Sequence, residues 1–391
     1  MRIGLIQSAP RGGLLHYAAQ LADGLAARGH DVVLITARGN ELGSEGVAEG
    51  ARLRAVLPAA SKGASEPPTG IRYLIRRAGV AARLFAAGAL TIREVRGGGF
   101  DAVVLIDDLN VALAALPMLA LAILPGGPPL AAICHEPRPR NRWSGGGMYV
   151  ERGALNRVLH ALYRHLDLVL VHGERSRAEF QSTWGPTPTA VIPHGNEGML
   201  AKRDLPPADE ERILFFGDWR RSKGLPELME AFDQLRERRP EARLTIAGTP
   251  YADGRPETVR AWAREHGEAV SVIDSYVPIE RLPDVFGPAR VVVTPYVAGS
   301  QSGVLHLAMS FGRAVVSSDV GELGSTVADG ETGRVVPAGD VAALAEALER
   351  VVADPKIADR LGRAARERMR SEAGWDRVAA KLELELTGVA G

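Results

Sequence analysis

The sequence contains one cysteine, no excess of either charge and no hydrophobic run long enough to cross a membrane. The single cysteine, Cys134, excludes an intramolecular disulfide and a cysteine-based metal cluster, which fits a reducing cytoplasm. Lys and Arg together number 47, as do Asp and Glu, so no field of one sign favours a nucleic-acid partner. We therefore expect no nucleic-acid binding, and contacts with anions or membranes that are local.

The two stretches that come closest to a membrane or targeting signal are better explained as parts of the fold. Residues 111–124, the most apolar window, are too short to span a bilayer and contain Pro117, so they predict a buried helix with a kink. The N-terminal MRIGLIQS has one arginine and a brief apolar run before Pro10, which predicts a first strand and not a signal peptide. Both interpretations favour a cytoplasmic location.

Length and patterning indicate two α/β domains. With 391 residues, the chain exceeds what one core usually serves, so we expect two domains of about 200 residues each. Runs rich in Val, Ile and Leu alternate with longer helical patterns, which predicts βαβ units around parallel sheets buried on both faces. The predicted strands form a first set, 2–7, 31–36, 101–107, 130–135, 167–172 and 189–193, and a second set, 212–216, 243–248, 270–274, 290–295, 314–318 and 333–336.

A polar stretch separates the two sets of strands. Residues 194–211 show no periodicity and contain Pro206-Pro207, as expected of an interdomain linker. We place one Rossmann-like domain at 1–195, the linker at 196–211, a second Rossmann-like domain at 212–372 and a final helical segment at 373–391. Ligands of open parallel sheets lie beyond the carboxyl ends of the strands, so the predicted fold is α/β with two Rossmann-like β/α/β domains facing each other across a cleft.

An anion-binding helix start is predicted within 294–312, where a buried strand leads through a loop of small residues into a helix. A helix start presents backbone N–H groups without intrahelical partners and a partial positive charge. Ser302, Gly303 and Val304 would therefore hold a phosphate through their backbone, and Gly303 has no side chain to obstruct it.

Two further loops at strand ends are candidates for phosphate contact. Gly12-Gly13 follow the first strand without forming the GxGxxG dinucleotide fingerprint, and such a pair is either a plain turn or a place where the backbone approaches a phosphate. Arg220, Arg221 and Lys223 follow the first strand of the second domain. This charge run is either a solvated loop or a set of cations for a diphosphate.

His135 ends the fourth predicted strand, just before Pro137 and Pro139 force the chain out of regular structure. A thiol–imidazole dyad with Cys134 is not expected, because neighbours on a strand point to opposite faces. A lone histidine is usually structural, but the carboxyl end of a strand is also where a ligand site is expected. Both interpretations of His135 stay open.

Residues 71–96 combine six arginines with apolar residues in one helical pattern. A basic amphipathic helix of this kind either docks on an anionic membrane surface or presents a solvated arginine face. We favour the solvated face, with peripheral contact at the inner membrane face as the alternative.

Taken together, these segments resemble the retaining glycosyltransferases of family 4, which have the GT-B fold. The resemblance covers nearly the whole chain, and its motifs are weak singly but specific in order and spacing. They are Gly12-Gly13, His135-Glu136-Pro137, Pro193-His194-Gly195, Gly217 with Lys223-Gly224, Ser302-Gly303-Val304, Ala308-Met309 with Gly312, and Gly330 with Thr332-Gly333.

The resemblance implies transfer of a sugar, with retention at the anomeric carbon, from a UDP-, GDP- or dTDP-linked donor to a glycan, lipid-linked or small-molecule acceptor. Residues 1–195 would bind the acceptor, 212–372 would bind the nucleotide sugar, and 373–391 would cross back to the N-terminal domain. No cofactor is implied beyond the nucleotide sugar as co-substrate. No metal is implied either, and Asp107-Asp108 is not a metal-binding Asp-x-Asp.

The resemblance also assigns roles to individual residues. His135 would contact the donor sugar as the catalytic residue. The donor diphosphate would meet the residues already named at the three loops: Gly12, Gly13, Arg221, Lys223, Ser302, Gly303 and Val304. The donor sugar would lie against Gly299, Ser300 and Gln301, and the base against Tyr276 and Val277.

Three departures from the family pattern affect the sugar and nucleotide contacts. Both glutamates of the usual E-x7-E motif are missing, since the loop offers Gly299, Ser300 and Gln301 and Leu307 precedes Ala308. Asp218 replaces the expected arginine after Gly217, and the glutamate common near position 321 is absent. We infer a branch of the family with Ser-Gly-Val in this loop, and the identity of the sugar stays open. The alternatives are a nucleotide-sugar epimerase and a non-catalytic nucleotide-binding partner protein.

Overall fold

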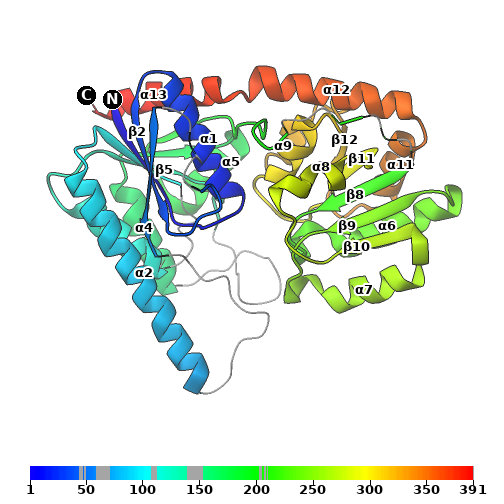
Figure 1. Cartoon of the computed structure of the whole chain (residues 1–391), viewed down its shortest axis with the longest axis horizontal. Helices are drawn as coiled ribbons and strands as arrows, with labels where there is room; N and C mark the ends of the chain where they lie inside the picture. Colours follow the sequence, from blue (N-terminus) through cyan, green and yellow to red (C-terminus); the bar gives the residue numbers. More distant parts are fainter. Residues whose placement is uncertain are drawn as a thin grey trace. The chain divides into compact units, whose positions relative to one another are not determined.

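The computed structural model describes residues 1–43, 47, 50–58, 71–106, 112–138, 153–201, 205–206, 208 and 210–390. The chain divides into two units, coloured along the sequence in Figure 1. Among the described residues, unit 1 consists of those within Met1–Pro139, Val150–His194 and Trp375–Gly391, and unit 2 of those within Gly195–Gly374. Each unit is built around a parallel sheet of its own.

The sheet of unit 1 has the order β3-β2-β1-β4-β5-β6-β7 within the described residues, and every pairing in it is parallel. Its strands are β1 Arg2–Gln7, β2 Asp31–Ala37, β3 Ala51–Leu57, β4 Ala102–Leu105, β5 Leu130–Ile133, β6 Leu168–Val171 and β7 Thr189–Val191. Its helices are α1 Gly13–Ala27, α2 Ile71–Gly97, α3 Ala112–Ile123, α4 Gly153–His165, α5 Glu174–Trp184 and α13 Trp375–Ala390.

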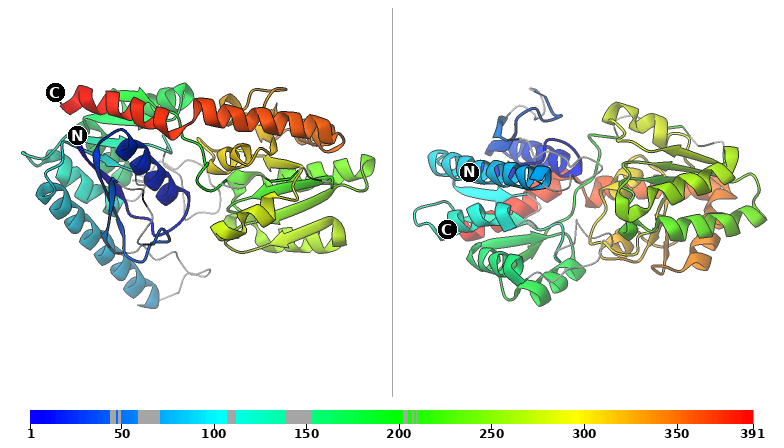
Figure 2. Two further views of the ribbon diagram at one scale, coloured as in Figure 1. Left: turned by 45° about the horizontal axis from the view of Figure 1, so that its top comes forward. Right: turned by 90° about the horizontal axis from the view of Figure 1, so that it is seen from below.

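Helices cover both faces of this sheet, as the two views of Figure 2 show. Successive side chains of a strand point to opposite faces of the sheet and pack in two separate hydrophobic clusters. Leu34 packs in the cluster with α1 and α13, whereas Val33 packs in the cluster with α3, α4 and α5. The helices α1 and α13 lie close together, because a Cβ on Gly24 would come within 2.8 Å of the carbonyl oxygen of Trp375. The expectation of strands buried on both faces is confirmed for β1, β2, β4, β5 and β6, whereas no residue of the edge strand β7 is buried.

The edge strand β3 is the one strand of unit 1 that the sequence pattern did not predict. Only Leu57 of its seven residues is buried, and two of its alternating side chains are arginines. Arg52 binds Asp31 at 2.7 Å and Arg54 binds Glu94 at 2.8 Å, so ion pairs fix this strand where apolar burial is slight. An edge strand with charged residues lacks the continuous Val, Ile and Leu content that identified the others.

The sheet of unit 2 has the order β10-β9-β8-β11-β12-β13, again with every pairing parallel among the residues described. Its strands are β8 Arg212–Phe216, β9 Arg243–Ala247, β10 Val270–Ile273, β11 Val291–Thr294, β12 Ala314–Ser318 and β13 Arg334–Val336. Its helices are α6 Leu225–Arg238, α7 Pro256–Glu265, α8 Leu282–Phe286, α9 Gly303–Ser310, α10 Leu323–Thr326, α11 Val341–Val352 and α12 Pro355–Glu372.

The two α/β domains with parallel sheets confirm the fold class predicted from the sequence. Most of the apolar window 111–124 forms α3 with Pro117 inside it, and Pro117 packs where a side chain on Gly88 of α2 would clash. The predicted burial holds only in part, because Leu116, Ile123 and Leu124 are at least 45% exposed. No helix in the described part of the chain is long and apolar enough to cross a membrane. The pair Asp107-Asp108 lies outside the described residues.

The basic segment 71–96 forms most of α2. The side chains of residues 71–77 lie outside the described part, so the arginines at its start are not placed. Farther along, Phe85 is 69% exposed and Arg93 binds the buried Glu94. Membrane docking through this helix therefore stays a prediction.

Candidate functional site

The predicted phosphate residues of unit 2 gather at the carboxyl ends of two neighbouring strands. Gly217 directly follows β8, the loop 295–302 follows β11, and these two strands pair in register. A Cβ on Gly217 would lie 3.4 Å from the Cγ2 atom of Val304, which places the two segments in contact. The carboxyl ends of parallel strands meet at one edge of a sheet, and this arrangement explains why residues about 90 positions apart share one site.

Ser302 is the N-cap of α9. Its backbone is extended, and its Oγ accepts a hydrogen bond from the Leu305 N–H at 3.2 Å. The same Oγ lies 3.0 Å from the hydroxyl of Tyr296, and both side chains are buried. Ser302 thus fixes the direction of α9, whose first two amides belong to Gly303 and Val304.

Tyr296 joins this helix start to the basic loop after β8. The Lys223 Nζ lies 3.7 Å from the centre of the Tyr296 ring, at cation–π distance. The Val297 N–H donates to the Ser222 carbonyl oxygen at 3.0 Å. Gly224 adopts a φ of 73°, and a Cβ there would overlap the carbonyl oxygen of Pro295. The structure therefore brings Lys223 and Ser302 into contact with one tyrosine, which the sequence did not single out.

The two arginines of the basic loop are engaged with protein groups. Arg221 forms a bidentate pair with Glu227, with N–O distances of 2.9 and 2.5 Å. The Arg220 guanidinium stacks on Tyr251 at 3.7 Å and has Asp253 within 4.0 Å. A diphosphate contact through Arg221 would have to compete with Glu227, so Lys223 is the better candidate of the two.

The loop 299–301 is supported by the turn after β12. Ser300 is fully buried, and its carbonyl oxygen accepts the Glu322 N–H at 2.9 Å. Gly321 adopts a φ of 54°, and a Cβ there would collide with the backbone of Gly299 and Ser300. Gln301 follows in the same loop, so all three predicted sugar-loop residues lie directly before the cap of α9.

The predicted base-binding residues lie farther along the sheet. Tyr276 and Val277 follow β10, which is separated from β8 by β9. Val277 is buried in a core cluster with Leu282 and Phe286, while Tyr276 is 37% exposed. Of these two side chains, only that of Tyr276 reaches the surface of unit 2 to meet a ligand.

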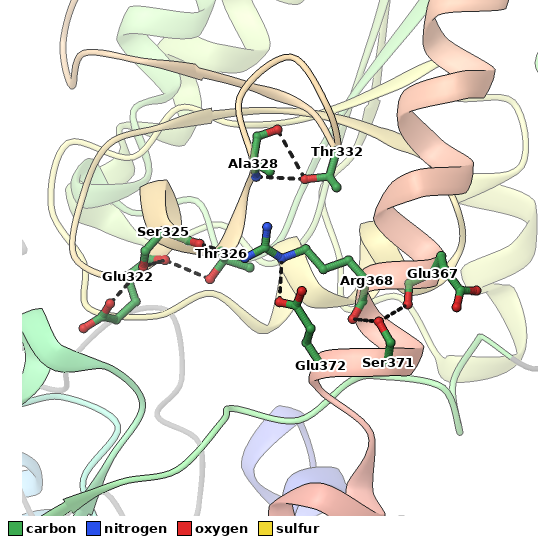
Figure 3. Close-up of polar contacts among 9 residues, drawn as sticks. All are labelled: Glu322, Ser325, Thr326, Ala328, Thr332, Glu367, Arg368, Ser371 and Glu372. Carbon is green, nitrogen blue, oxygen red and sulfur yellow. Dashed lines mark hydrogen bonds and ion pairs between the residues drawn. The ribbon is translucent and has the colours of Figure 1, made fainter.

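Two buried glutamates lie next to the loop that lacks the family's glutamates. The Glu197 Oε1 lies 3.7 Å from the position that a Cβ on Gly303 would occupy, and its backbone N–H donates to the Ser310 Oγ at 3.1 Å. Glu322 accepts the Ser325 hydroxyl on its carboxylate at 2.9 Å, as Figure 3 shows. Sequence reasoning missed both, because neither falls at the spacing of the expected motif.

The segment that carries Glu322 is tied to α12. Ser325 and Thr326 both donate to the Glu322 carbonyl oxygen, at 3.0 and 2.8 Å (Figure 3). Arg368 of α12 donates to the Ser325 carbonyl oxygen at 3.4 Å and pairs with Glu372 at 3.1 Å. Ser325 thus links the Glu322 carboxylate to α12, through its hydroxyl on one side and its carbonyl oxygen on the other.

In unit 1, the Gly12-Gly13 loop starts α1. Gly12 has a φ of 97°, which favours glycine, whereas a Cβ on Gly13 would meet nothing within 4 Å. The Gly12 N–H donates to the Glu41 carboxylate at 2.5 Å, and the same oxygen lies 2.8 Å from the His16 Nε2. A carboxylate thus occupies the helix start where the sequence predicted a phosphate, so a diphosphate at the Gly12 N–H would have to compete with Glu41.

His135 lies beyond β5 in a group of rings. Its Nδ1 is 3.0 Å from the Nε2 of His172, and the rings of Tyr17 and His194 lie 4.8 and 5.9 Å from its own. Burial, with His194 nearby, lowers the pKa of His135 to about 3, so its imidazole is neutral at physiological pH. Its buried Nε2 has no hydrogen-bond partner among the described residues.

Cys134 belongs to a different environment, as strand alternation predicts. Its Sγ lies 3.9 Å from the hydroxyl of Tyr163, and it packs in the core between the sheet and α3 to α5. Burial raises the pKa of the thiol to about 12. Cys134 and His135 therefore form no nucleophilic pair.

Two parallel-sheet domains, each with glycine turns and helix starts beyond its strand ends, define a two-domain α/β protein. Residues 12–195 match the family model of a glycosyl transferase 4-like domain, and residues 210–354 match that of glycosyl transferases group 1. The chain belongs to this family of glycosyltransferases.

Relatives and solved structures agree with this assignment. Alpha-maltose-1-phosphate synthase from Mycolicibacterium smegmatis is 30% identical over 291 residues, covering 66% of this chain and 73% of that protein. Glycogen synthase from Mycobacterium tuberculosis is 28% identical over 392 residues, covering 94% and 89%. Sucrose-phosphate synthase from Thermosynechococcus elongatus superposes with a TM-score of 0.75 at 22% identity, covering 100% of this chain and 99% of that one. Anabaena HepE in complex with UDP-glucose superposes with a TM-score of 0.73 at 15% identity, covering 99% and 100%. The GT-B fold expected from the sequence is confirmed.

Proposed function

We propose that the protein transfers a sugar from a nucleotide-diphosphate sugar to an acceptor hydroxyl, with retention of anomeric configuration and without a metal ion. The observation that carries this proposal is the arrangement of Lys223, Tyr296 and Ser302 at the start of α9. It supplies a cation and preorganised amides at one sheet edge, the combination that a diphosphate requires.

The leaving group determines what this site must do. Cleavage of the glycosidic bond leaves a nucleoside diphosphate that gains negative charge. The amides of Gly303 and Val304, together with the ammonium of Lys223, would stabilise that charge as it develops. In a front-face mechanism the leaving phosphate itself takes the proton of the acceptor hydroxyl, so no separate base is needed.

His135 is the group we assign to the donor sugar. The Nδ1 of His172 lies 3.4 Å from the carbonyl oxygen of Ile192, which can only accept, so this nitrogen carries the hydrogen. The Nε2 of His172 then accepts from the Nδ1 of His135, and the Nε2 of His135 is left as a lone pair. That lone pair would accept a hydrogen bond from a sugar hydroxyl.

The donor is proposed as a class rather than as one compound. UDP-glucose is bound in the solved structure of HepE, and ADP in that of a starch synthase from Arabidopsis thaliana. We therefore expect a UDP-, GDP-, dTDP- or ADP-linked sugar. The acceptor would be a glycan, a lipid-linked glycan or a small molecule, with α2 as the candidate contact for a membrane-borne acceptor.

Nucleotide binding tests the proposal most simply. A nucleoside diphosphate present at one hundred times its Kd should stabilise the folded protein by about 2.7 kcal/mol, which a thermal shift detects. Lys223→Ala should lose at least about tenfold in affinity, since a charge-assisted contact contributes roughly 1.5–3 kcal/mol. Lys356→Ala, an exposed lysine of α12, is the matched control and should bind like the wild type. Equal affinity in Lys223→Ala and wild type would contradict the assigned site.

A further inference from the structure

Three histidines from the ends of three adjacent strands meet in unit 1. His135 follows β5, His172 follows β6 and His194 follows β7, and these strands are neighbours in the sheet. One ring nitrogen from each histidine lies within 4.8 Å of those of the other two. His172 is buried and the other two histidines are partly buried, so the group is mostly removed from solvent but keeps some exposure to it.

We propose that His135, His172 and His194 form a binding site for a divalent transition-metal ion of the Zn²⁺ type. Three imidazoles around a tetrahedral zinc, with Zn–N bonds of about 2.0–2.1 Å, place their nitrogens roughly 3.4 Å apart and their ring centres roughly 5 Å apart. The ring centres here are 4.7, 4.9 and 5.9 Å apart, and the Nδ1 of His135 lies 3.0 Å from the Nε2 of His172. Small side-chain rotations bring the three nitrogens to coordination distance.

The hydrogen bonds around His172 also suit a metal ligand. Metal-binding histidines usually donate their second ring N–H to a carbonyl or carboxylate, which fixes the tautomer that leaves a lone pair for the metal. His172 makes this contact with the carbonyl oxygen of Ile192. Its Nε2 therefore directs its lone pair toward the Nδ1 of His135, inside the cluster.

The chemistry of the cluster selects the kind of ion. It offers three imidazole nitrogens, a donor set that suits Zn²⁺, Cu²⁺ or Ni²⁺, whereas Mg²⁺ and Ca²⁺ prefer oxygen. Tyr17 borders the cluster, with its ring centre 4.8, 5.7 and 5.5 Å from those of His135, His172 and His194. Three protein ligands leave a fourth coordination position for water or another ligand.

Metal binding would change the hydrogen on His135. The Nδ1 of His135 and the Nε2 of His172 share one hydrogen, and a metal ion between them displaces it. By exchange with solvent, the imidazole of His135 loses the hydrogen on Nδ1 and gains one on Nε2, so the ring stays neutral. The Nε2 then donates where it previously accepted. A metal ion in this site would therefore weaken the contact between His135 and the donor sugar and slow sugar transfer. This effect on transfer rests on the proposed function, whereas metal binding itself does not.

Metal titration of the whole chain, freed of metal beforehand, tests the site without any substrate. Isothermal titration with Zn²⁺ should give one site per chain, and Co²⁺ should give the intense visible absorption of a four-coordinate ion. His172→Asn and His194→Asn should each weaken binding by more than about 100-fold, since even loss of an outer contact costs 10–100-fold. His165→Asn, on the exposed end of α4, is the matched control and should bind like the wild type.

A second measurement covers the case in which a histidine variant fails to fold. X-ray absorption at the zinc edge of the loaded wild-type protein should show about three imidazole nitrogens at roughly 2.0 Å. Spectra with fewer than two imidazoles would overturn the proposal. So would the absence of a stoichiometric site in the wild type, or folded His172→Asn and His194→Asn variants that bind as the wild type does.

Discussion

Replacing Ser302 by alanine tests whether this one hydroxyl holds the start of α9 in place. The Oγ of Ser302 accepts from the Leu305 N–H and contacts the Tyr296 hydroxyl, so the substitution removes two bonds at once. Loss of an N-cap costs about 0.5–2 kcal/mol. Leaving the buried Tyr296 hydroxyl without this partner adds about 1–3 kcal/mol. We therefore expect a local loss of about 1.5–5 kcal/mol at the start of α9.

Hydrogen exchange of the α9 amides is the appropriate assay, because a chain of two units need not unfold in one step. At 1.4 kcal/mol for each factor of ten, Ser302→Ala should speed exchange there by roughly 10- to 4,000-fold. Tyr296→Phe keeps the cap and should cost only about 0.5–1.5 kcal/mol. The double variant removes both partners, so its loss should be smaller than the sum of the two single losses.

The control for this series is Ser371→Ala. Ser371 lies at the end of α12 and bonds only to carbonyl oxygens of its own helix among the described residues (Figure 3), so its loss should leave α9 unchanged. Additive effects of Ser302→Ala and Tyr296→Phe would refute the coupling between cap and ring. Unchanged α9 exchange in Ser302→Ala would refute the cap itself.

Three further predictions concern other parts of the chain. His135→Ala should lower kcat while the Kd for nucleoside diphosphates, measured by titration, stays within about twofold, since the ring is assigned to the sugar and not to the phosphates; a large loss of nucleotide affinity would count against that role. Gly224→Ala should destabilise unit 2 by more than about 1 kcal/mol, because the new Cβ would overlap the Pro295 carbonyl oxygen and the backbone has a positive φ. Gly13→Ala should leave stability unchanged, because a Cβ there has open space around it. Denaturant melts that show equal losses for the two variants would contradict this. Burial raises the pKa of Cys134 to about 12, so the native thiol should react with a disulfide reagent at pH 8 far more slowly than the thiol of the unfolded chain does; equal reaction rates would show that the thiol is exposed. The free energy of unfolding should also fall as the pH rises above about 9, because the unfolded chain then loses the thiol proton that the folded chain keeps.

The sequence predicted the fold because most strands are continuous apolar runs. Twelve runs of this kind correspond to strands in the structure, and the ordering of parallel strand ends explains why Gly217 and Val304 meet. The exception, β3, is held by Arg52 and Arg54 at an exposed edge, where apolar patterning carries no signal.

The side-chain partners of the site were much less predictable. His135 was identified from its place after a strand, but His172 lies 37 residues away and only the order of β5, β6 and β7 brings them together. Glu197 lies in a stretch without periodicity, and its burial beside Gly303 depends on the tertiary fold. The sequence placed Tyr296 only in the loop after β11, because a cation–π contact has no characteristic spacing of residues along a chain.

The measurement that tests the account most directly is mass spectrometry of a panel of nucleotide sugars incubated with the wild-type protein and with Lys223→Ala. We predict that the wild type releases a nucleoside diphosphate from at least one donor, by transfer or slow hydrolysis, and that the variant does so at least about tenfold more slowly. A product anomer that matches the donor, read by NMR, would establish retention. A wild-type protein that leaves every nucleotide sugar intact with a broad set of acceptors, and binds none of them, would contradict the proposed function.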